Sequence, residues 1–552
     1  MMLLRRSLLS FERTVASAWR ALDRPAVLAR ALLLVPVLFG LLSLLYGQDD
    51  NWDLHNYHLY NPFALVHGKI GYDLAPGQWQ SYFNPTIDLL YYGLNAVLPA
   101  PATGFVMGWL HGLNFVLLAA IARRLLPPQS HRAALLLALA GTLGPGFLSE
   151  LGNTMGDNLI ALTVLGALLL VLRAWPLLLQ GGAPAWRAVA LAGLLAGFGT
   201  GLKLTNAMYA LALCLALFGV PAAFWLRFRL AFVFGLGTLA GIAVSAGHWY
   251  WRMWHTFGNP LFPQFNNIFK APLAAPIGIG DTGWIPKGIA EKLLWPFIFS
   301  YNSKRVIEIA LTQLIWPMVY LAGVALAVRL LRDVIAGQRP AGKLERPAGY
   351  ALLFFGLSYL VWLNLFGIYR YLVPLELLAP LALWLALQRL MPAAIGRHVA
   401  AWALLLATVA TFPGASWGHG GWTRTPTTAQ LPPLPEPEQN MIFTVHGDPP
   451  MSWLVPLFPD RLAFVALGGG FPESAAYGAK ALEMMAARRG PFYVMLQAEG
   501  DNQKIWPAAQ EVLGRYGITF DPADCVKYQA AVGTNQHPYQ LCPVQPPRTG
   551  SK

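Results

Sequence analysis

Long apolar segments alternate with short polar ones over the first 414 residues of the chain. A helix needs about 20 mostly apolar residues to cross the ~30 Å hydrocarbon layer of a bilayer. The pattern predicts an all-α polytopic membrane domain over residues 1–414 with about 11 transmembrane helices. The expected spans are 27–46, 104–122, 133–149, 158–178, 187–202, 206–226, 230–247, 308–330, 348–366, 371–389 and 398–414.

Two connections between these spans, 47–103 and 248–307, are too long to be plain loops. Both mix Trp, Tyr and His with aliphatic residues, a composition typical of helices in the membrane interface. The order of the spans places both connections on the same side of the membrane as the C-terminus. We therefore expect two outer loops that contain helices.

The pattern changes after a Pro-, Thr- and Gly-rich linker at 415–438. Beyond this linker, short apolar runs alternate with stretches of helical period. The runs MIFTVH, RLAFVAL and FYVMLQ predict buried strands, and ESAAYGAKALEMMAARR and IWPAAQEVLGRYG predict helices. Residues 439–552 are thus predicted to form a small extracytoplasmic α/β domain with a largely parallel sheet.

Composition narrows the class of protein further. The 552 residues are 56% hydrophobic and 12% charged, whereas soluble domains carry about 25% charged residues. A chain of this kind has more apolar surface than a water-soluble core of its size buries. Composition therefore excludes a soluble enzyme, a coiled coil, a disordered chain and a disulfide-rich secreted scaffold.

The net charge is +13, and the distribution of the cations along the chain indicates a membrane topology rather than a nucleic-acid-binding surface. With the N-terminus in the cytoplasm, the cytoplasmic ends of the spans hold 20 Lys and Arg against four acids, and the opposite side holds 19 against 22. Such an excess of cytoplasmic cations sets the orientation of membrane helices. We expect a multi-pass protein of the bacterial inner membrane with a periplasmic C-terminal domain and no nucleic-acid partner. The first apolar run lacks a clear cleavage site, so we expect it to remain as an anchor.

Three cysteines add one structural expectation. Cys214 lies inside an expected span, where a small apolar residue fits. Cys525 and Cys542 both lie in the expected outer domain, and an oxidising compartment permits a disulfide there. We expect these two residues to be bonded, and the spacing of Cys and His gives no zinc motif.

Acidic residues directly follow the first expected span. Asp49 and Asp50 stand there, in a segment that continues with Asp53, His55, Tyr57 and His58. Adjacent carboxylates are costly to hold near lipid, which favours a functional role. Solvated loop residues are the simpler alternative.

A second polar group, from Glu150 to Asp157, separates spans three and four, and Asp157 also suits the start of a helix. Lys203 interrupts an apolar run at the outer end of span five, and Arg370 stands at the outer start of span ten, followed by Tyr371. Either cation could instead snorkel to the interface.

Topology alone brings these elements to one face of the membrane. A carboxylate there can deprotonate an acceptor hydroxyl or amine. Lys, Arg or a divalent ion held by acids can stabilise a leaving phosphate. The combination suits transfer of a sugar from a lipid-linked phosphate.

In the order of these motifs the chain resembles the GT-C superfamily of polyprenyl-phosphate-dependent glycosyltransferases, most of all the protein O-mannosyltransferases and the lipid A aminoarabinose transferases. The resemblance covers about residues 27–390. Asp50 stands where that family more often has Glu, and the C-terminal α/β domain matches no family signature. The proline pair of the second outer helix is reduced to Asn84-Pro85. The resemblance rests on Asp49-Asp50, GDNLIAL with Asp157, GTGLKLTN with Lys203, GNPLFPQFNN and Arg370-Tyr371.

The resemblance implies a sugar donor carried on polyprenyl phosphate, inversion at the anomeric carbon, and an extracytoplasmic glycan, lipid or protein as acceptor. It implies Asp49, Asp50 and Asp157 as catalytic acids, or as ligands of a divalent cation such as Mg²⁺ or Mn²⁺. For the donor phosphate it implies Lys203, Arg370, Tyr371 and Arg252. Further substrate contacts are expected from His55, Tyr57, His58, His248, Trp249, His255, Asn259 and Glu150.

Two alternatives remain open at this point. A transporter or flippase of lipid-linked sugars needs ionisable groups near the bilayer midplane, and His111 and Glu376 are the main polar residues inside the expected spans. A non-catalytic envelope-assembly subunit would use the α/β domain to bind a partner. The concentration of polar residues at the outer interface favours the enzyme.

Overall fold

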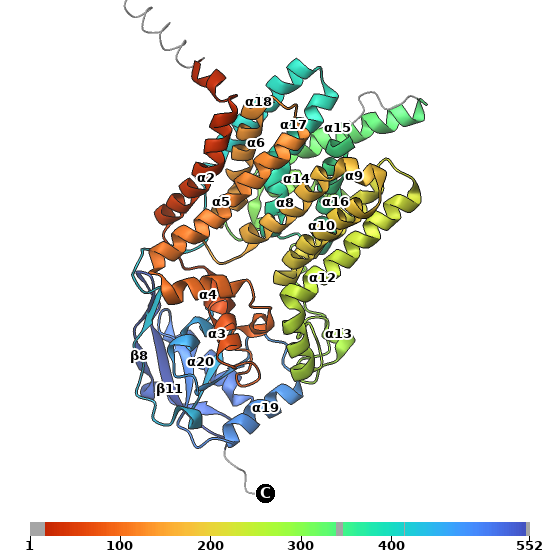
Figure 1. Cartoon of the computed structure of the whole chain (residues 1–552). Helices are drawn as coiled ribbons and strands as arrows, with labels where there is room; N and C mark the ends of the chain where they lie inside the picture. The colour runs from red at the N-terminus through yellow and green to blue at the C-terminus, as the bar shows by residue number, and fades with distance from the viewer. Residues whose placement is uncertain (1–16, 338–345, 413, 548–552) are drawn as a thin grey trace, which may run out of the picture.

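The computed structural model describes residues 17–337, 346–412 and 414–547. A bundle of long helices forms one end of the molecule and the C-terminal strands form a sheet at the other end (Figure 1). Between them lie α3 (Tyr60–Val66) and α4 (Asp88–Val97) of the first outer segment. Some of the charged residues that were counted to predict the membrane orientation lie in 1–16 and 338–345, outside the described residues.

The bundle has the helices of a multi-pass membrane protein. Within the described ranges, seven helices are long and apolar enough to cross a bilayer. They are α2 (Pro25–Tyr46), α5 (Ala100–Leu125), α10 (Ala183–Leu202), α12 (Phe224–Phe257), α16 (Arg346–Leu365), α17 (Val373–Leu390) with the turn before it, and α18 (Ala393–Ala410).

The expected count of eleven spans is not confirmed. Helices also form at the other four expected segments, but α6 (His131–Thr142), α8 (Asp157–Arg173) and α11 (Ala207–Ala216) have 12, 17 and 10 residues. Each is shorter than the roughly 20 residues that a span needs. The fourth helix, α15 (Ile315–Ile335), carries charged residues in its last turn and is not among the seven helices apolar enough to span a bilayer. The remaining helices are α7 (Pro145–Ser149), α9 (Trp175–Gln180), α13 (Asn266–Phe269), α14 (Gly288–Tyr301), α19 (Ala475–Ala486) and α20 (Asn502–Gly514).

Glycines bring α10 and α12 into close contact. A Cβ added at Gly197 would lie 2.0 Å from the Thr238 carbonyl oxygen, and one at Gly241 would lie 2.1 Å from that of Leu194. Small residues of this kind let membrane helices approach backbone to backbone. With 34 residues, α12 is about 51 Å long, so it continues beyond the bilayer thickness into the second outer segment.

The main sheet has six strands in the order β5-β4-β6-β11-β7, with β8 also paired to β11. The three strands expected from the apolar runs are confirmed as β4, β5 and β6, and they pair in parallel. The other half is antiparallel, because β11 runs back against β6, so the expected largely parallel sheet is wrong there. The strands are β1 (Gln48–Asp49), β2 (His419–Gly420), β3 (Thr427–Ala429), β4 (Met441–Val445), β5 (Ala463–Leu467), β6 (Phe492–Gln497), β7 (Thr519–Phe520), β8 (Val526–Tyr528), β9 (Ala530–Val532), β10 (Asn535–Gln536) and β11 (Tyr539–Gln545).

Both faces of this sheet are covered, and one cover comes from the N-terminal half of the chain. On one face, Phe443 shares a core with Tyr477 of α19. On the other face, Ile442 shares a core with Phe63 of α3. Alternate strand residues point to opposite faces, so β4 contributes to both cores. The expected boundary at residue 439 therefore separates elements that pack around common cores.

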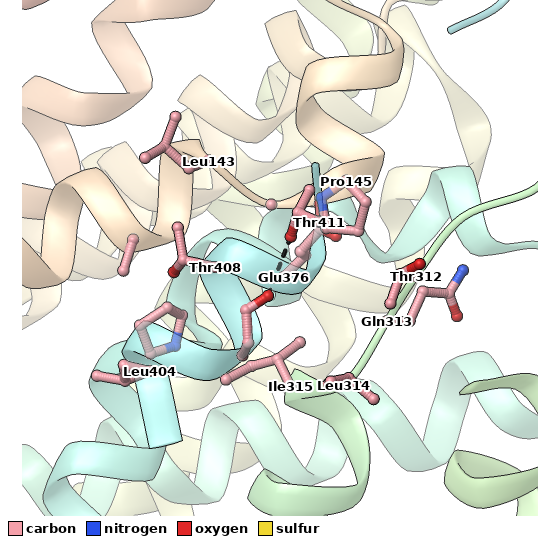
Figure 2. A pocket seen from close by; sticks show the side chains of 14 residues that line it. Leu143, Pro145, Thr312, Gln313, Leu314, Ile315, Glu376, Leu404, Thr408 and Thr411 are labelled. Atoms are coloured by element: carbon pink, nitrogen blue, oxygen red, sulfur yellow. Dashed lines mark hydrogen bonds between the residues drawn. The ribbon is translucent and has the colours of Figure 1, made fainter. Parts of the chain in front are cut away.

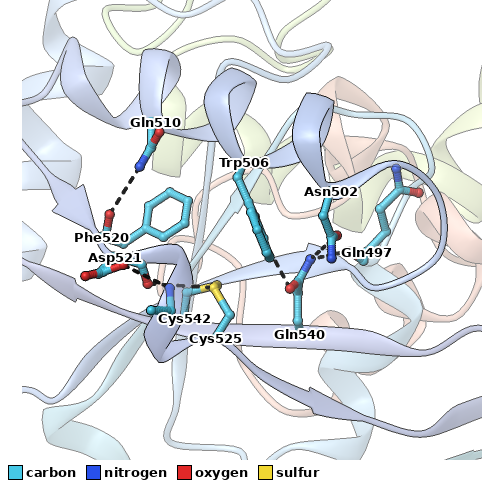
Figure 3. The surroundings of a disulfide bond; sticks show 10 residues. Gln497, Asn502, Trp506, Gln510, Phe520, Asp521, Cys525, Gln540 and Cys542 are labelled. Carbon is cyan, nitrogen blue, oxygen red and sulfur yellow. Dashed lines mark hydrogen bonds between the residues drawn. A yellow bond between two sulfur atoms is a disulfide. The ribbon is translucent and has the colours of Figure 1, made fainter.

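A disulfide closes the last part of the sheet. Cys525, just before β8, is bonded to Cys542 of β11, as the sequence predicts (Figure 3). Cys214 is a free, half-buried thiol in α11. The bond links the residue before β8 to β11, the strand with which β8 pairs.

Candidate functional site

Two ion pairs lie where the bundle meets the outer segments. Lys203 Nζ lies 2.6 Å from the Asp157 carboxylate, and Arg370 Nη1 lies 2.7 Å from that of Asp53. All four side chains are largely buried, with side-chain exposures between 5% and 18%. We call these four residues the charged centre.

Helix ends place the charged centre. Asp157 begins α8, directly after Gly156, whose φ of +86° lies in the left-handed region that glycine adopts readily. Lys203 follows the last residue of α10, and Arg370 lies in the turn before α17. Three helices therefore end at one place, as the predicted order of the spans requires.

The two ion pairs share one environment. Lys203 Nζ lies 5.4 Å from the ring centre of Tyr371, and the Arg370 guanidinium lies 6.0 Å from the same centre. Burial acts to raise the pKa of Asp53, but the positive charges of Arg370 and nearby groups including Lys203 outweigh burial and lower that pKa. The cations therefore hold Asp53 ionised.

A histidine and a third carboxylate border the charged centre. His58 Nδ1 lies 2.6 Å from Asp88 Oδ1, and both side chains are buried. Burial raises the pKa of Asp88, while His58 acts against that rise. His58 Nε2 is buried and has no hydrogen-bond partner among the described residues, and the same holds for Arg370 Nε. The Tyr57 hydroxyl lies 3.4 Å from Asp53.

Glu150 is the most deeply buried acid of this region. It is fully buried, and neither carboxyl oxygen has a hydrogen-bond partner among the described residues. Burial and then the negative charge of Asp157 raise its pKa well above the usual range. Glu150 is therefore held in its neutral form beside the charged centre.

Asp49 and Asp50 point to different places. Asp49 accepts hydrogen bonds from the backbone and side chain of Asn51, and from the backbone N–H and hydroxyl of Thr154 at 2.8 and 2.7 Å. Its carboxylate is therefore occupied in tying the end of α2 to the loop before α8. That contact lies three residues from Asp157, so the two acids are on the same side of the bundle.

Asp50 instead faces two imidazoles. His55 Nε2 and His537 Nε2 lie 2.6 and 3.0 Å from Asp50 Oδ1. Within the described part of the chain, these residues form the one group of three or more metal-ligating side chains close enough to share an ion. The expected ligands Asp49, Asp50 and Asp157 do not come together in the described structure, because Asp49 bonds Thr154, Asp157 bonds Lys203 and Asp50 faces the two imidazoles.

In the described structure, the residues expected on and after α12 form no ion pair or hydrogen bond with the charged centre. Trp249 is buried and donates to the Tyr82 carbonyl at 2.9 Å, and Asn259 holds a turn by bonding Leu261 and Gln264. These two residues are structural. The other three residues, which are exposed, are His248, Arg252 and His255.

Sequence reasoning missed several participants. Asp53 was noted beside Asp49 and Asp50 but was given no role, and Asp88 was not singled out, although both belong to the polar-aromatic outer segment in which the site was expected. His537 and Asn535, which donates to Asp50 at 2.6 Å, come from the far end of the chain. No local pattern in the sequence connects them to Asp50.

A small cavity lies on the bundle side, next to Glu376 (Figure 2). The Glu376 carboxylate accepts from the backbone N–H groups of Gly146 and Phe147 at 3.0 and 2.8 Å and from the Tyr369 hydroxyl at 2.6 Å. It caps the first turn of α7. This buried acid is therefore satisfied by structural contacts, which does not favour a transport role for it.

Comparison with protein-family models, curated proteins and solved structures finds no match for this chain. Its function is therefore argued from the side chains of the site.

Proposed function

We propose that the protein is a membrane glycosyltransferase that moves a sugar from a polyprenyl-phosphate donor to an extracytoplasmic acceptor. The observation that carries the proposal is the charged centre, in which Asp157, Lys203 and Arg370 stand at the ends of three bundle helices and Asp53 joins them from the segment after α2. Lys203 and Arg370 supply permanent positive charge for the donor phosphate. Asp53 and Asp157 supply carboxylates for the acceptor.

The chemical step is a single displacement. The acceptor oxygen or nitrogen attacks the anomeric carbon as the bond from that carbon to the phosphate oxygen breaks. The polyprenyl phosphate leaves with the bonding electron pair, and its charge is stabilised by Arg370 and Lys203. The acceptor proton passes to Asp53, which acts as general base. Direct displacement inverts the anomeric carbon.

The existing ion pairs couple binding to activation. Each cation is already paired with a carboxylate, so a bound phosphate competes with that carboxylate for the cation. As Arg370 turns toward the phosphate, Asp53 loses its partner and becomes a stronger base. His58, oriented by Asp88, has its Nε2 atom available as a hydrogen-bonding group for the sugar.

The donor would reach this centre from the outer leaflet of a bacterial inner membrane, with the N-terminus in the cytoplasm. The excess of cations that the sequence places in the loops expected on the cytoplasmic side supports that orientation. A reporter fused to the C-terminus should be active only outside the cytoplasm. Activity inside the cytoplasm would place the charged centre on the wrong side and refute the proposed donor.

Transfer is tested with the full chain in membranes supplied with labelled polyprenyl-phosphate sugars. Asp53→Asn keeps the shape of the side chain but removes the base, so turnover should fall by about 10²–10⁴-fold. Asp460→Asn is the matched control, because Asp460 pairs with His67 at an exposed site. Equal activity of wild type and Asp53→Asn would overturn the assigned role of Asp53. Absence of any labelled product with wild type would overturn the function.

A further inference from the structure

A second polar cluster shares no side chain with the charged centre. Asp50, His55 and His537 bring their ligating atoms within 4.8 Å of one another. The residues come from the segment after α2 and from the turn before β11. We call these three residues the imidazole cluster.

We propose that the imidazole cluster binds a divalent transition-metal ion of the zinc class. This inference does not depend on the proposed transfer reaction. Two imidazoles and one carboxylate are a known ligand set for zinc sites with one open position. Mixed nitrogen and oxygen donors favour zinc-like ions over Mg²⁺, which prefers oxygen donors alone.

The distances suit such an ion after a small adjustment. Asp50 Oδ1 lies 2.6 Å from His55 Nε2 and 3.0 Å from His537 Nε2. Zinc bonds of about 2.0–2.2 Å in a tetrahedron hold ligand atoms roughly 3.3–3.5 Å apart. Each contact therefore opens by less than about 1 Å when an ion replaces the shared hydrogens.

Neighbouring groups orient the ligands. Asn535 Nδ2 donates to Asp50 Oδ2 at 2.6 Å, which leaves Oδ1 directed at the imidazoles. The Asp50 N–H donates to the Gly418 carbonyl at 3.0 Å. The Trp453 ring lies 5.3 Å from the His55 ring, centre to centre. Partners of this kind fix ligand geometry in metal sites.

Access to the site comes from one side. The Asp50 and His55 side chains are 5% and 8% exposed, whereas the His537 side chain is 31% exposed. An ion can therefore enter beside His537, and a water can take the open fourth position. A bound ion would link the segment after α2 to the strands of the C-terminal sheet.

The test is a zinc titration of the full chain in detergent, purified through a tag without histidine and treated with a chelator. Wild type should bind about one ion per chain, and Co²⁺ in its place should give visible tetrahedral absorption. His537→Ala should weaken zinc affinity by more than about 100-fold, because even the loss of an orienting partner costs about 10–100-fold. Asn535→Ala should fall within that smaller range.

Two further variants guard against a folding defect. His537→Cys retains a zinc ligand, so it should recover binding that His537→Ala loses. His67→Ala removes a histidine that bridges the same two regions through Asp460, and it should bind zinc as wild type does. Absence of saturable zinc binding by wild type, or unchanged affinity in His537→Ala, would show that the cluster is only a hydrogen-bonded contact.

Discussion

Two buried ionic sites of this chain differ in how completely their hydrogen bonds are satisfied. Lys69 Nζ contacts Asp73 at 3.1 Å and the carbonyls of Asp460 and Leu462 at 3.0 and 2.5 Å, which uses all three of its donors. Asp73 also accepts from the Phe464 N–H. In the charged centre, Arg370 Nε and the neighbouring His58 Nε2 have no partner among the described residues.

The difference separates a structural pair from a site that can accept a ligand. Buried polar atoms are almost always hydrogen-bonded in stable proteins. The Lys69–Asp73 pair obeys that rule, and it joins the first outer segment to the edge of β5. The charged centre departs from it, as functional sites do. The two sites should therefore respond differently to the same kind of substitution.

The first expected effect is on activity at the charged centre. Arg370→Ala removes the charge proposed to bind the donor phosphate, and a charge-assisted hydrogen bond contributes about 1.5–3 kcal/mol. Donor affinity should fall by about 10–150-fold on that basis, and turnover should fall as well. Kinetics of transfer against donor concentration measure both. Arg370→Lys keeps the charge and should recover part of the affinity, and a variant with wild-type kinetics would remove Arg370 from the donor site.

The next effect is on stability at the Lys69–Asp73 pair. Lys69→Met leaves Asp73 buried without its partner, and breaking such a pair costs about 3–5 kcal/mol. Thermal unfolding in detergent should shift strongly, while the activity of the molecules that remain folded should not change. The double variant Lys69→Met/Asp73→Asn should regain part of the stability. Lost activity in folded Lys69→Met would abolish the contrast between the two sites.

How well the sequence predicts a contact of the site depends on how many residues separate the two partners along the chain. Asp157, Lys203 and Arg370 were predicted together because each stands at the end of an apolar segment, and the order of spans puts those ends on one side. The sequence predicts that Asp49 and Asp50 lie after the first span, but where their carboxylates point depends on Thr154 and His537. Such partners lie 105 and 487 residues away, and no periodic pattern encodes them.

The fold was predictable to a similar degree. Alternation of apolar runs predicted β4, β5 and β6 because buried parallel strands are continuously hydrophobic. It did not predict β11, whose sequence YQLCPVQ mixes polar residues and a proline. It also did not predict that α3 covers one face of the sheet. That contact joins two halves of the chain, and only tertiary packing determines it.

Measuring stability as a function of pH tests the structural role of Asp73. Burial raises the pKa of Asp73 to about 6, although Lys69 and the Phe464 N–H act against the rise. The unfolded chain has a pKa near 3.9 for this group. Between about pH 4 and pH 6 the folded state thus holds a proton that the unfolded state has released, so stability falls as pH rises. The difference amounts to about 3 kcal/mol over the window. The slope should be absent in Asp73→Asn, and an equal slope in both proteins would assign it to another group.

The smallest effect concerns a contact without charge. Gly197→Ala would place a methyl group 2.0 Å from the Thr238 carbonyl oxygen, so α10 and α12 must separate. Overpacking of this kind costs about 1–3 kcal/mol. Gly235→Ala, on α12 with no atom within 4 Å of the added carbon, is the matched control and should be stabilising by up to about 1 kcal/mol through helix propensity. Thermal unfolding of the two variants measures the difference. Because Lys203 follows the C-terminal end of α10, Gly197→Ala should also weaken donor binding slightly, whereas Gly235→Ala should not. If both variants unfold at the same temperature, Gly197 is not needed for close packing of α10 on α12, and equal donor binding would show that this packing does not position Lys203.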